Sequence, residues 1–299
     1  MNSYQGSLFD LPELEEKKVK DLTATFADNM KMPIHKWYRY TAGFSAAWVS
    51  ELIREEISNG RTRIIDPFAG SGTVLIESEF AGVESYGVEA HPYIYRIAKA
   101  KLNWNYPPDK FKEEALALLK IAKSKNITQT EYPKLIMSCY PLETIQKLEA
   151  LKQTWLDTSQ DEEIKNFNWF IITAILRTTS PVGTAQWQYI QPNKTKSKVI
   201  DPFVAFESKV NDMYLDMKRT QNRFKNVVDS IILNEDARNI ESIPDGWGDL
   251  VITSPPYANN YDLANSVFEY IILELKPGLS FSNRAFLFLG KDGFWIGDF

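Results

Sequence analysis

The chain has 299 residues, of which 44% are hydrophobic and 24% are charged, and its formal net charge is −5. This is the composition of a soluble globular protein with one large or two modest cores. No apolar run approaches the roughly 20 residues that a bilayer-spanning helix needs. The first residues also lack the basic and apolar stretches of a signal peptide, so we expect a cytoplasmic protein.

Cysteine and histidine are scarce. The single cysteine, Cys139, excludes an internal disulfide and fits a reducing compartment. The only histidines are His35 and His91, so we expect no metal site. The negative net charge argues mildly against a nucleic-acid binder but leaves a local basic groove open. The many aromatic residues could pack in cores or stack on planar ligands.

Predicted strands and helices alternate in the first third of the chain. Residues 1–30 are polar, and we expect an arm or a short helix there. Helical spacing begins at Ser45 and ends at Asn59-Gly60. The stretch "RTRIIDPFAGSGTVLIESEFAG" predicts a strand, a glycine-rich turn and a helix over residues 73–80 that Gly82 ends. A second strand, "ESYGVEAHP", and a helix, "YIYRIAKAKLNWN", follow.

Residues 106–226 break this alternation, because they are mostly amphipathic helices. The alternation then resumes with a strand ending at Asp236, a strand in "GWGDLVITSPPY", a helix in "NSVFEYIILEL" and a last strand, "RAFLFLG". We therefore predict an α/β fold with a doubly wound, mostly parallel sheet of five strands. The predicted parts are an arm (1–30), a sheet domain (31–105 and 227–299) and a helical insertion between strands two and three (106–226).

The segment "DPFAGSGT", residues 66–73, joins the first strand to a helix. Gly70 and Gly72 allow a tight turn whose backbone approaches a ligand, and the helix start offers unpaired N–H groups. Leu75 replaces the last glycine of the dinucleotide fingerprint, and no P-loop lysine follows, so a dinucleotide or a nucleoside triphosphate is disfavoured. A tight turn without a ligand is the alternative.

Two acidic residues end the next predicted strands. Glu89 follows Gly72 by 17 residues, a spacing at which a carboxylate can accept hydrogen bonds from both ribose hydroxyls. Asp236 could accept a hydrogen bond from the amino group of an adenine. The alternatives are a solvated carboxylate for Glu89 and a helix cap for Asp236.

The segment "TSPPY" ends the fourth predicted strand. Pro255 and Pro256 donate no hydrogen bonds, so the carbonyls of Ser254 and Pro255 and the Ser254 hydroxyl are free to accept them. Tyr257 adds a flat aromatic face. This acceptor-rich notch suits a planar base that carries an amino group, although a proline-terminated strand that packs a tyrosine explains the segment in isolation.

Together, "DPFAGSGT" and "TSPPY" resemble the S-adenosylmethionine-dependent amino-methyltransferases that act on DNA. The segment "IHKWYRYTAGFS" is similar to the one that precedes the cofactor loop in this family and helps hold the methionine end of the cofactor. The resemblance implies a Rossmann-like methyltransferase fold and covers residues of about 32–104 and 228–290. The cofactor-binding residues that it implies are His35, Asp66, Pro67, Phe68, Ala69, Gly70, Ser71, Gly72, Thr73, Glu89, Asp236 and Ala237.

The same resemblance implies that the catalytic residues are Ser254, Pro255, Pro256 and Tyr257. Serine at the head of this tetrad resembles the cytosine-N4 branch more than the adenine-N6 branch. Ser254 and the Pro255 carbonyl would accept the two hydrogens of the target amine, and Tyr257 would stack on a flipped-out base. Cys139 has no Pro-Cys context at a strand end, which argues against cytosine-C5 chemistry.

Double-stranded DNA is the partner that the resemblance implies, and phosphate contacts require basic residues. The segment "TAQWQYIQPNKTKSK" mixes amides, aromatics and lysines without a helical period, and "MKRTQNRFK" is a second basic stretch. Solvated surface is the alternative for both. The candidate DNA-binding residues are Gln188, Lys194, Lys196, Lys198, Arg219 and Arg223.

Three other functions remain open at this point: an adenine-N6 DNA methyltransferase, a non-catalytic subunit with a vestigial cofactor pocket, and an RNA or protein methyltransferase. Members of the family usually continue past the fifth strand with two more strands. We therefore expect the apolar strand "RAFLFLG" to be covered by a second polypeptide or by self-association.

Overall fold

The computed structural model describes residues 26–40, 45–128, 132–182, 196 and 198–254. The described residues form one four-stranded sheet in the order β3-β2-β1-β4, and each neighbouring pair of strands is parallel. The strands are β1 (Arg63–Asp66), β2 (Glu84–Val88), β3 (Ile231–Leu233) and β4 (Leu250–Val251). The chain runs outward from β1 to β3 and then returns to the other side of β1, which confirms the expected α/β class. The expected strand "RAFLFLG" lies outside the described residues.

Helices make up most of the rest. Those around the sheet are η2 (Phe26–Lys31), η3 (His35–Trp37), α1 (Ala46–Ser58), α2 (Thr73–Ala81), α3 (Pro92–Leu102) and η4 (Asn103–Asn105). The helices between η4 and β3 are α4 (Pro108–Ser124), α5 (Lys134–Cys139), α6 (Leu142–Asp157), α7 (Glu162–Thr179) and α8 (Pro202–Arg223). The expected helical segment between strands two and three is therefore present.

The helix ends follow local sequence signals. The Ser45 side chain accepts a hydrogen bond from the Trp48 N–H and starts α1, and the Asp201 side chain does the same for Phe203 and Val204 at the start of α8. Gly82, in the left-handed conformation with φ of 71°, ends α2. The boundaries of α1 and α2 agree with the sequence prediction to within a residue or two.

The strand ends differ from the prediction. β3 stops at Leu233 rather than at Asp236, because the next residue, Asn234, turns its side chain to the Glu89 carbonyl at 2.8 Å. β4 has only two residues in the ladder, although the Ile252 N–H still donates to the Ile65 carbonyl. The short helix α5, of six residues, was not predicted individually.

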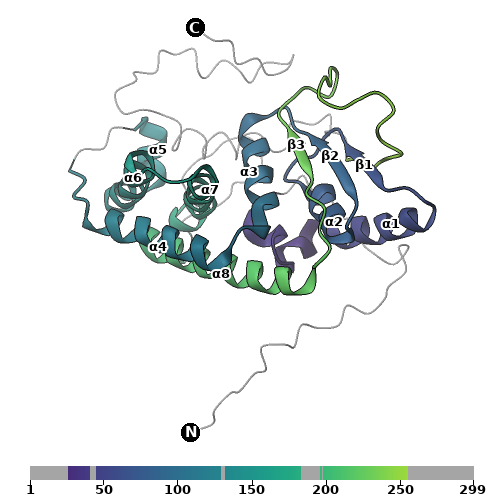
Figure 1. The fold of residues 1–299 in the computed structure, drawn as a ribbon. Helices are drawn as coiled ribbons and strands as arrows, with labels where there is room; N and C mark the ends of the chain where they lie inside the picture. The colour runs from purple at the N-terminus through teal and green to yellow at the C-terminus, as the bar shows by residue number, and fades with distance from the viewer. Residues whose placement is uncertain (1–25, 41–44, 129–131, 183–195, 197, 255–299) are drawn as a thin grey trace.

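The inserted helices and the sheet share a hydrophobic core. One buried cluster extends from Ile34 and Trp37 through α3 to helices α4, α6, α7 and α8. Figure 1 shows α3 between the sheet and the inserted helices, with α8 running along the base of both. The insertion therefore packs continuously against the segment that contains η3.

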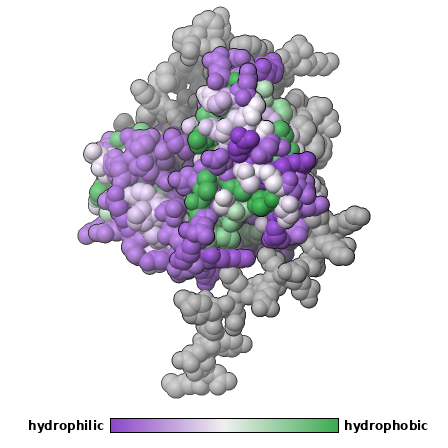
Figure 2. Space-filling view, turned by 45° about the vertical axis from the view of Figure 1, so that its right-hand side comes forward, coloured by the Kyte–Doolittle hydropathy of each residue, from purple (hydrophilic) through white to green (hydrophobic). Residues whose placement is uncertain are grey.

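A smaller buried cluster joins α1, α2 and the sheet, with Val49, Ile64, Val74 and Ile252 among its members. On the outer surface, Figure 2 shows apolar side chains exposed among polar ones. Scattered exposure of this kind is normal for a folded protein. No helix in the described part of the chain is long and apolar enough to cross a membrane.

Gly82 provides a test of this packing. A Cβ atom at Gly82 would lie 2.8 Å from the Asn226 carbonyl oxygen, and Gly82 has φ of 71°. We expect Gly82→Ala to lower the free energy of unfolding by about 2–4 kcal/mol in urea denaturation, because both the backbone strain and the contact with a rigid carbonyl oppose the substitution.

Gly60→Ala is the matched control. Gly60 has φ of 83°, but a Cβ atom there meets nothing within 4 Å. Its substitution should therefore cost only the conformational strain, about 1 kcal/mol. Equal losses in the two variants would contradict the packing of residue 226 against the end of α2.

Candidate functional site

The turn between β1 and α2, which we call the cofactor loop (residues 66–72), is held in a fixed shape by its own backbone. Asp66 ends β1, and its carboxylate accepts a hydrogen bond from the Phe68 N–H at 3.1 Å. Gly70 and Gly72 have φ of 52° and 83°, which favours glycine at both positions. A Cβ atom at Gly70 would lie 3.0 Å from the Tyr40 ring, so a larger residue would not fit there without a shift.

The cofactor loop and the start of the "SPPY" segment lie side by side. β1 lies between β2 and β4, so the strand order reverses at this point, which is where ligands of open α/β sheets bind. The Thr253 hydroxyl donates a hydrogen bond of 2.7 Å to the Asp66 carboxylate. Ser254 follows directly and is half-buried. The other tetrad residues, Pro255, Pro256 and Tyr257, lie outside the described residues.

Glu89 reaches the same loop from the end of β2. One carboxylate oxygen accepts a hydrogen bond from the Gly70 N–H at 3.0 Å, and the other accepts one from the His91 N–H at 2.8 Å. Burial raises the pKa of this carboxyl. The structure thus brings Glu89 to the cofactor loop, as expected from the sequence, and its role toward a ribose stays a prediction.

Asp236 lies in a turn after β3. Its carboxylate accepts hydrogen bonds from the Arg238 guanidinium at 3.0 and 3.1 Å, and these bonds lower the pKa of Asp236 to about 2. Its backbone forms an isolated bridge with Asn239, so Asp236 and Ala237 lie in a local turn rather than at a strand end. Arg238 holds Asp236 at present, and a ligand at this carboxylate has to share or replace that cation.

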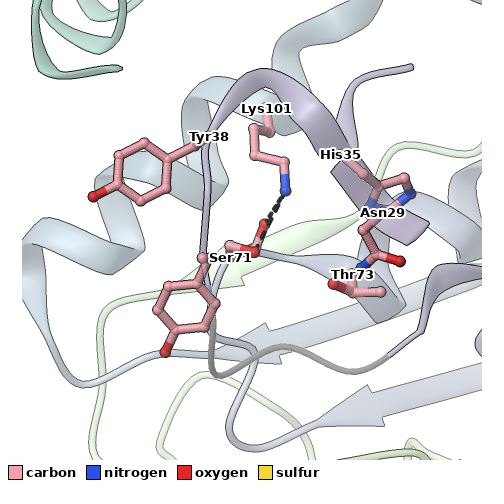
Figure 3. A pocket seen from close by; sticks show the side chains of 7 residues that line it. Asn29, His35, Tyr38, Ser71, Thr73 and Lys101 are labelled. Carbon is pink, nitrogen blue, oxygen red and sulfur yellow. Dashed lines mark hydrogen bonds between the residues drawn. The ribbon is translucent and has the colours of Figure 1, made fainter. Parts of the chain in front are cut away.

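A small cavity lies between the cofactor loop and the segment that contains η2 and η3 (Figure 3). Its volume is about 10 Å³, close to the space that one water molecule needs. Its lining residues are Asn29, His35, Tyr38, Tyr40, Ser71, Thr73 and Lys101. His35, Ser71 and Thr73 are sequence-predicted site residues, and the structure brings them together.

The sequence analysis did not identify two charged residues of this region. Glu77, on α2, lies 2.7 Å from Nε2 of His35, and both side chains are buried. Lys101, on α3, is buried and donates a hydrogen bond of 2.8 Å to the Ser71 carbonyl. A signal for Lys101 does exist: it follows the buried Ile97 by four residues, and lysine is rare on the buried face of a helix.

The candidate DNA-binding residues are dispersed. The Lys196 ammonium group donates to the Arg177 carbonyl in the last turn of α7, and Lys198 is exposed. Arg219 is also exposed. Gln188 and Lys194 lie outside the described residues.

Arg223 lies away from the cofactor loop. Its guanidinium lies over the Phe224 ring, which stacks on Phe80 with ring centroids 4.2 Å apart. Phe80 is in the last turn of α2, whereas the cofactor loop precedes the first turn, and a helix of nine residues is roughly 13 Å long. Any DNA contact of Arg223 therefore has to be made at the opposite edge of the sheet.

The parallel sheet with its reversal at β1, and the glycine loop placed beside Ser254, define an α/β fold of the Rossmann-like methyltransferase type. Residues 3–100 match a family model described as DNA methylase, of N6/N4 methyltransferases. This match confirms the resemblance to the amino-methyltransferases of the N4/N6 family. It spans β1, the cofactor loop and β2.

Curated relatives agree with this family. The chain is 27% identical over 267 residues to type II methyltransferase M.BsoBI of Geobacillus stearothermophilus, covering 80% of this chain and 52% of the relative. It is 28% identical over 268 residues to M.AvaI of Nostoc sp., with 80% and 53% covered. It is 23% identical over 252 residues to M.MvaI of Kocuria varians, with 78% and 55% covered. The chain thus spans about half the length of these relatives. No solved structure matches it.

The buried Asp66 carboxyl makes a pH-dependent prediction. Burial raises its pKa from 3.8 to about 7, so the folded protein keeps a proton that the unfolded chain has lost between these values. The contribution of Asp66 to stability is therefore full below pH 3.8 and is lost as the pH rises through about 7. Between about pH 5 and about pH 7.5, we expect the free energy of unfolding to fall by about 2 kcal/mol more for the wild type than for Asp66→Asn.

Urea denaturation at the two pH values measures this difference. Burial also raises the pKa of Glu79, to about 8, but that group is present in both proteins and cancels in the comparison. Asp249→Asn is the control, because hydrogen bonds from residues 62 and 63 lower the pKa of Asp249 and its contribution changes little above pH 5. Parallel pH profiles for Asp66→Asn and the wild type would contradict the prediction.

Proposed function

We propose that this protein transfers a methyl group from S-adenosylmethionine to the exocyclic amino group of a base in DNA, and that the base is cytosine, methylated at N4. The observation that carries the proposal is the contact between Thr253 and Asp66, because it joins the glycine-rich cofactor loop to the head of the "SPPY" segment. One ligand at the reversal of strand order can therefore reach both segments.

The residues of the loop fit this cofactor. Gly70 and Gly72 have positive φ and let the loop turn tightly, and the Glu89 carboxylate beside them offers the acceptors that ribose hydroxyls need. The exposed ring of Phe68 offers an apolar face at the loop. When bound, S-adenosylmethionine supplies a methyl group that its positive sulfur activates.

Ser254 is the residue that we propose to act on the base. The lone pair of an exocyclic amine is delocalised into the ring, so the amine is a weak nucleophile. Acceptance of its two hydrogens by the Ser254 hydroxyl and the Pro255 carbonyl would favour tetrahedral nitrogen and free the lone pair for attack. Tyr257 would stack on the flipped-out base. The protein contributes orientation and placed acceptors, and no cysteine nucleophile is needed.

The choice of base rests on Ser254 alone, and adenine N6 is the alternative. The names of the curated relatives specify type II methyltransferases and no base. Because the chain spans about half of their length, we propose that target recognition and full activity involve further polypeptide, either a second chain or a continuation of this one. At a net charge of −5, DNA binding requires local basic residues such as Lys198.

Gly70→Val tests the cofactor site. A valine at Gly70 meets the Tyr40 ring at 3.0 Å and has an unfavourable φ of 52°, so the loop cannot keep its shape. Titration calorimetry with S-adenosylhomocysteine should show binding to the wild type and at least a tenfold loss in the variant, about 1.4 kcal/mol. Gly60→Val, at a positive φ but in open space, is the control. Unchanged affinity in a folded Gly70→Val protein would remove this assignment.

Ser254→Ala tests the chemistry. Labelled methyl transfer to DNA, followed by digestion to nucleosides, measures both the rate and the base. We expect Ser254→Ala to leave S-adenosylhomocysteine binding unchanged and to lower the rate roughly 10²-fold, by analogy with the loss of one positioned hydrogen-bonding group. Label in N4-methylcytosine supports the proposal, and label in N6-methyladenine selects the alternative. A wild type that binds the cofactor product but labels neither base would show that this chain is not catalytic by itself, either because it needs the further polypeptide or because it is a non-catalytic subunit.

A further inference from the structure

Lys101 is a buried cation at the cofactor loop without a carboxylate partner. Its side chain is 1% exposed, and its ammonium group donates to the Ser71 carbonyl at 2.8 Å and lies 3.5 Å from the Ser71 hydroxyl. Among the described residues, no carboxylate forms an ion pair with it. A buried charge without a partner is costly, so such groups often mark sites where a ligand supplies the opposite charge.

No acidic side chain of the described residues lies within ion-pair distance of the Lys101 ammonium group. Figure 3 shows Lys101 pointing from α3 toward Ser71, with His35 and Tyr38 on the segment that closes the cavity. Glu77, a buried acid on α2, is hydrogen-bonded to Nε2 of His35 at 2.7 Å and is not within ion-pair distance of Lys101. Nδ1 of His35 is buried without a hydrogen-bond partner. Burial lowers the pKa of His35, although the hydrogen bond with Glu77 opposes this shift.

The cofactor loop strengthens the preference for an anion. Ser71, the partner of Lys101, lies one residue before Gly72, the N-cap of α2, and no side chain caps this helix start. The first N–H groups of a helix carry partial positive charge and favour an anionic group. The cavity has room for about one water molecule, so its lining has to move to admit a carboxylate.

We propose that Lys101 is the specificity-determining cation that recognises the carboxylate at the amino-acid end of the nucleoside cofactor. This inference rests on the proposed function, because it assumes that the loop binds S-adenosylmethionine. Pairing with the carboxylate offsets the cost of the buried ammonium, so the protein discriminates nucleosides that have this carboxylate from those that lack it.

A purely structural role for Lys101 makes a different prediction. If its only task were to hold the Ser71 carbonyl, its removal would distort the loop and weaken every ligand that the loop binds. A charge that recognises one carboxylate affects only ligands that have it. Comparing two ligands in two variants therefore separates the roles.

The ligands are des-amino S-adenosylhomocysteine, which has the carboxylate and no titratable amine, and 5′-methylthioadenosine, which has neither group. The variants are Lys101→Met, which keeps the apolar stem without the charge, and Lys99→Met, an exposed lysine on the same helix, as the control. Calorimetry on the full chain should show that Lys101→Met weakens the carboxylate ligand by about 30-fold or more. Binding of 5′-methylthioadenosine should be unchanged in both variants.

The pH profile of the wild type gives a second measurement that needs no variant. Burial lowers the pKa of Lys101 to about 7. The ammonium is therefore present below this pH, and affinity for the carboxylate ligand should fall by up to tenfold per pH unit above it. The titratable groups around Lys101 are His35, Glu77, Tyr38 and Tyr40, with Asp66 and Glu89 on the adenosine side. Titration of Asp66 or Glu89 would change the affinity for 5′-methylthioadenosine as well.

The outcomes separate the inference from the proposed function. Selective loss of the carboxylate ligand, with a flat profile for 5′-methylthioadenosine, supports the role of Lys101. Equal loss of both ligands in Lys101→Met, or no loss, overturns it, as does a pH profile that is the same for both ligands if Lys101→Met does not fold. A wild type that binds neither ligand nor S-adenosylhomocysteine overturns the proposed cofactor itself.

Discussion

The parallel pairing of β1 with β4 is the constraint on which the site depends. It places Asp66 and Thr253, which are 187 residues apart in the chain, at a hydrogen-bond distance of 2.7 Å. The Asp66 carboxylate serves both sides, because it also accepts the Phe68 N–H that turns the cofactor loop. A change in the register of β4 would move Ser254 away from the loop, since each step along a strand is roughly 3.3 Å. The location of the head of the tetrad is thus decided by sheet pairing rather than by the tetrad itself.

The inserted helices also support the site, because α8 holds the segment that contains His35. The Asp216 carboxylate on α8 accepts a hydrogen bond from the Trp37 indole at 3.0 Å and pairs with Lys36 at 2.9 Å. Lys209 on the same helix donates to the Trp37 carbonyl at 2.9 Å. These contacts fix the segment that brings His35 to the cavity. The helical insertion is therefore part of the support of the cofactor loop, whatever its role toward DNA.

The sequence predicted those features that depend on nearby residues. The tight turn at Gly70 and Gly72, the helix end at Gly82 and the alternation of strands and helices follow from local chemistry, and the structure has them. The end of β3 was predicted three residues too late, because the competing contact of Asn234 with the Glu89 carbonyl joins residues that are 145 positions apart. The role of Glu77 and the contacts of α8 with Trp37 were not predicted for the same reason, because they join residues that are far apart in the chain. Lys101 was missed as well, although its spacing of four residues from the buried Ile97 was a signal available in the sequence.

Burial of ionisable groups around the cofactor loop gives the site its electrostatic character. Asp66 and Lys101 both have a pKa shifted to about 7, one raised and one lowered, because burial disfavours the charged form of each. At neutral pH the protein therefore holds an acid and a base that are each only partly ionised. A ligand with a carboxylate at one end and hydrogen-bond donors at the other would stabilise the charged form of Lys101 and reduce the cost of its burial. Part of the binding free energy would then come from a charge that folding alone leaves poorly solvated, which favours a nucleoside with a carboxylate over one without it.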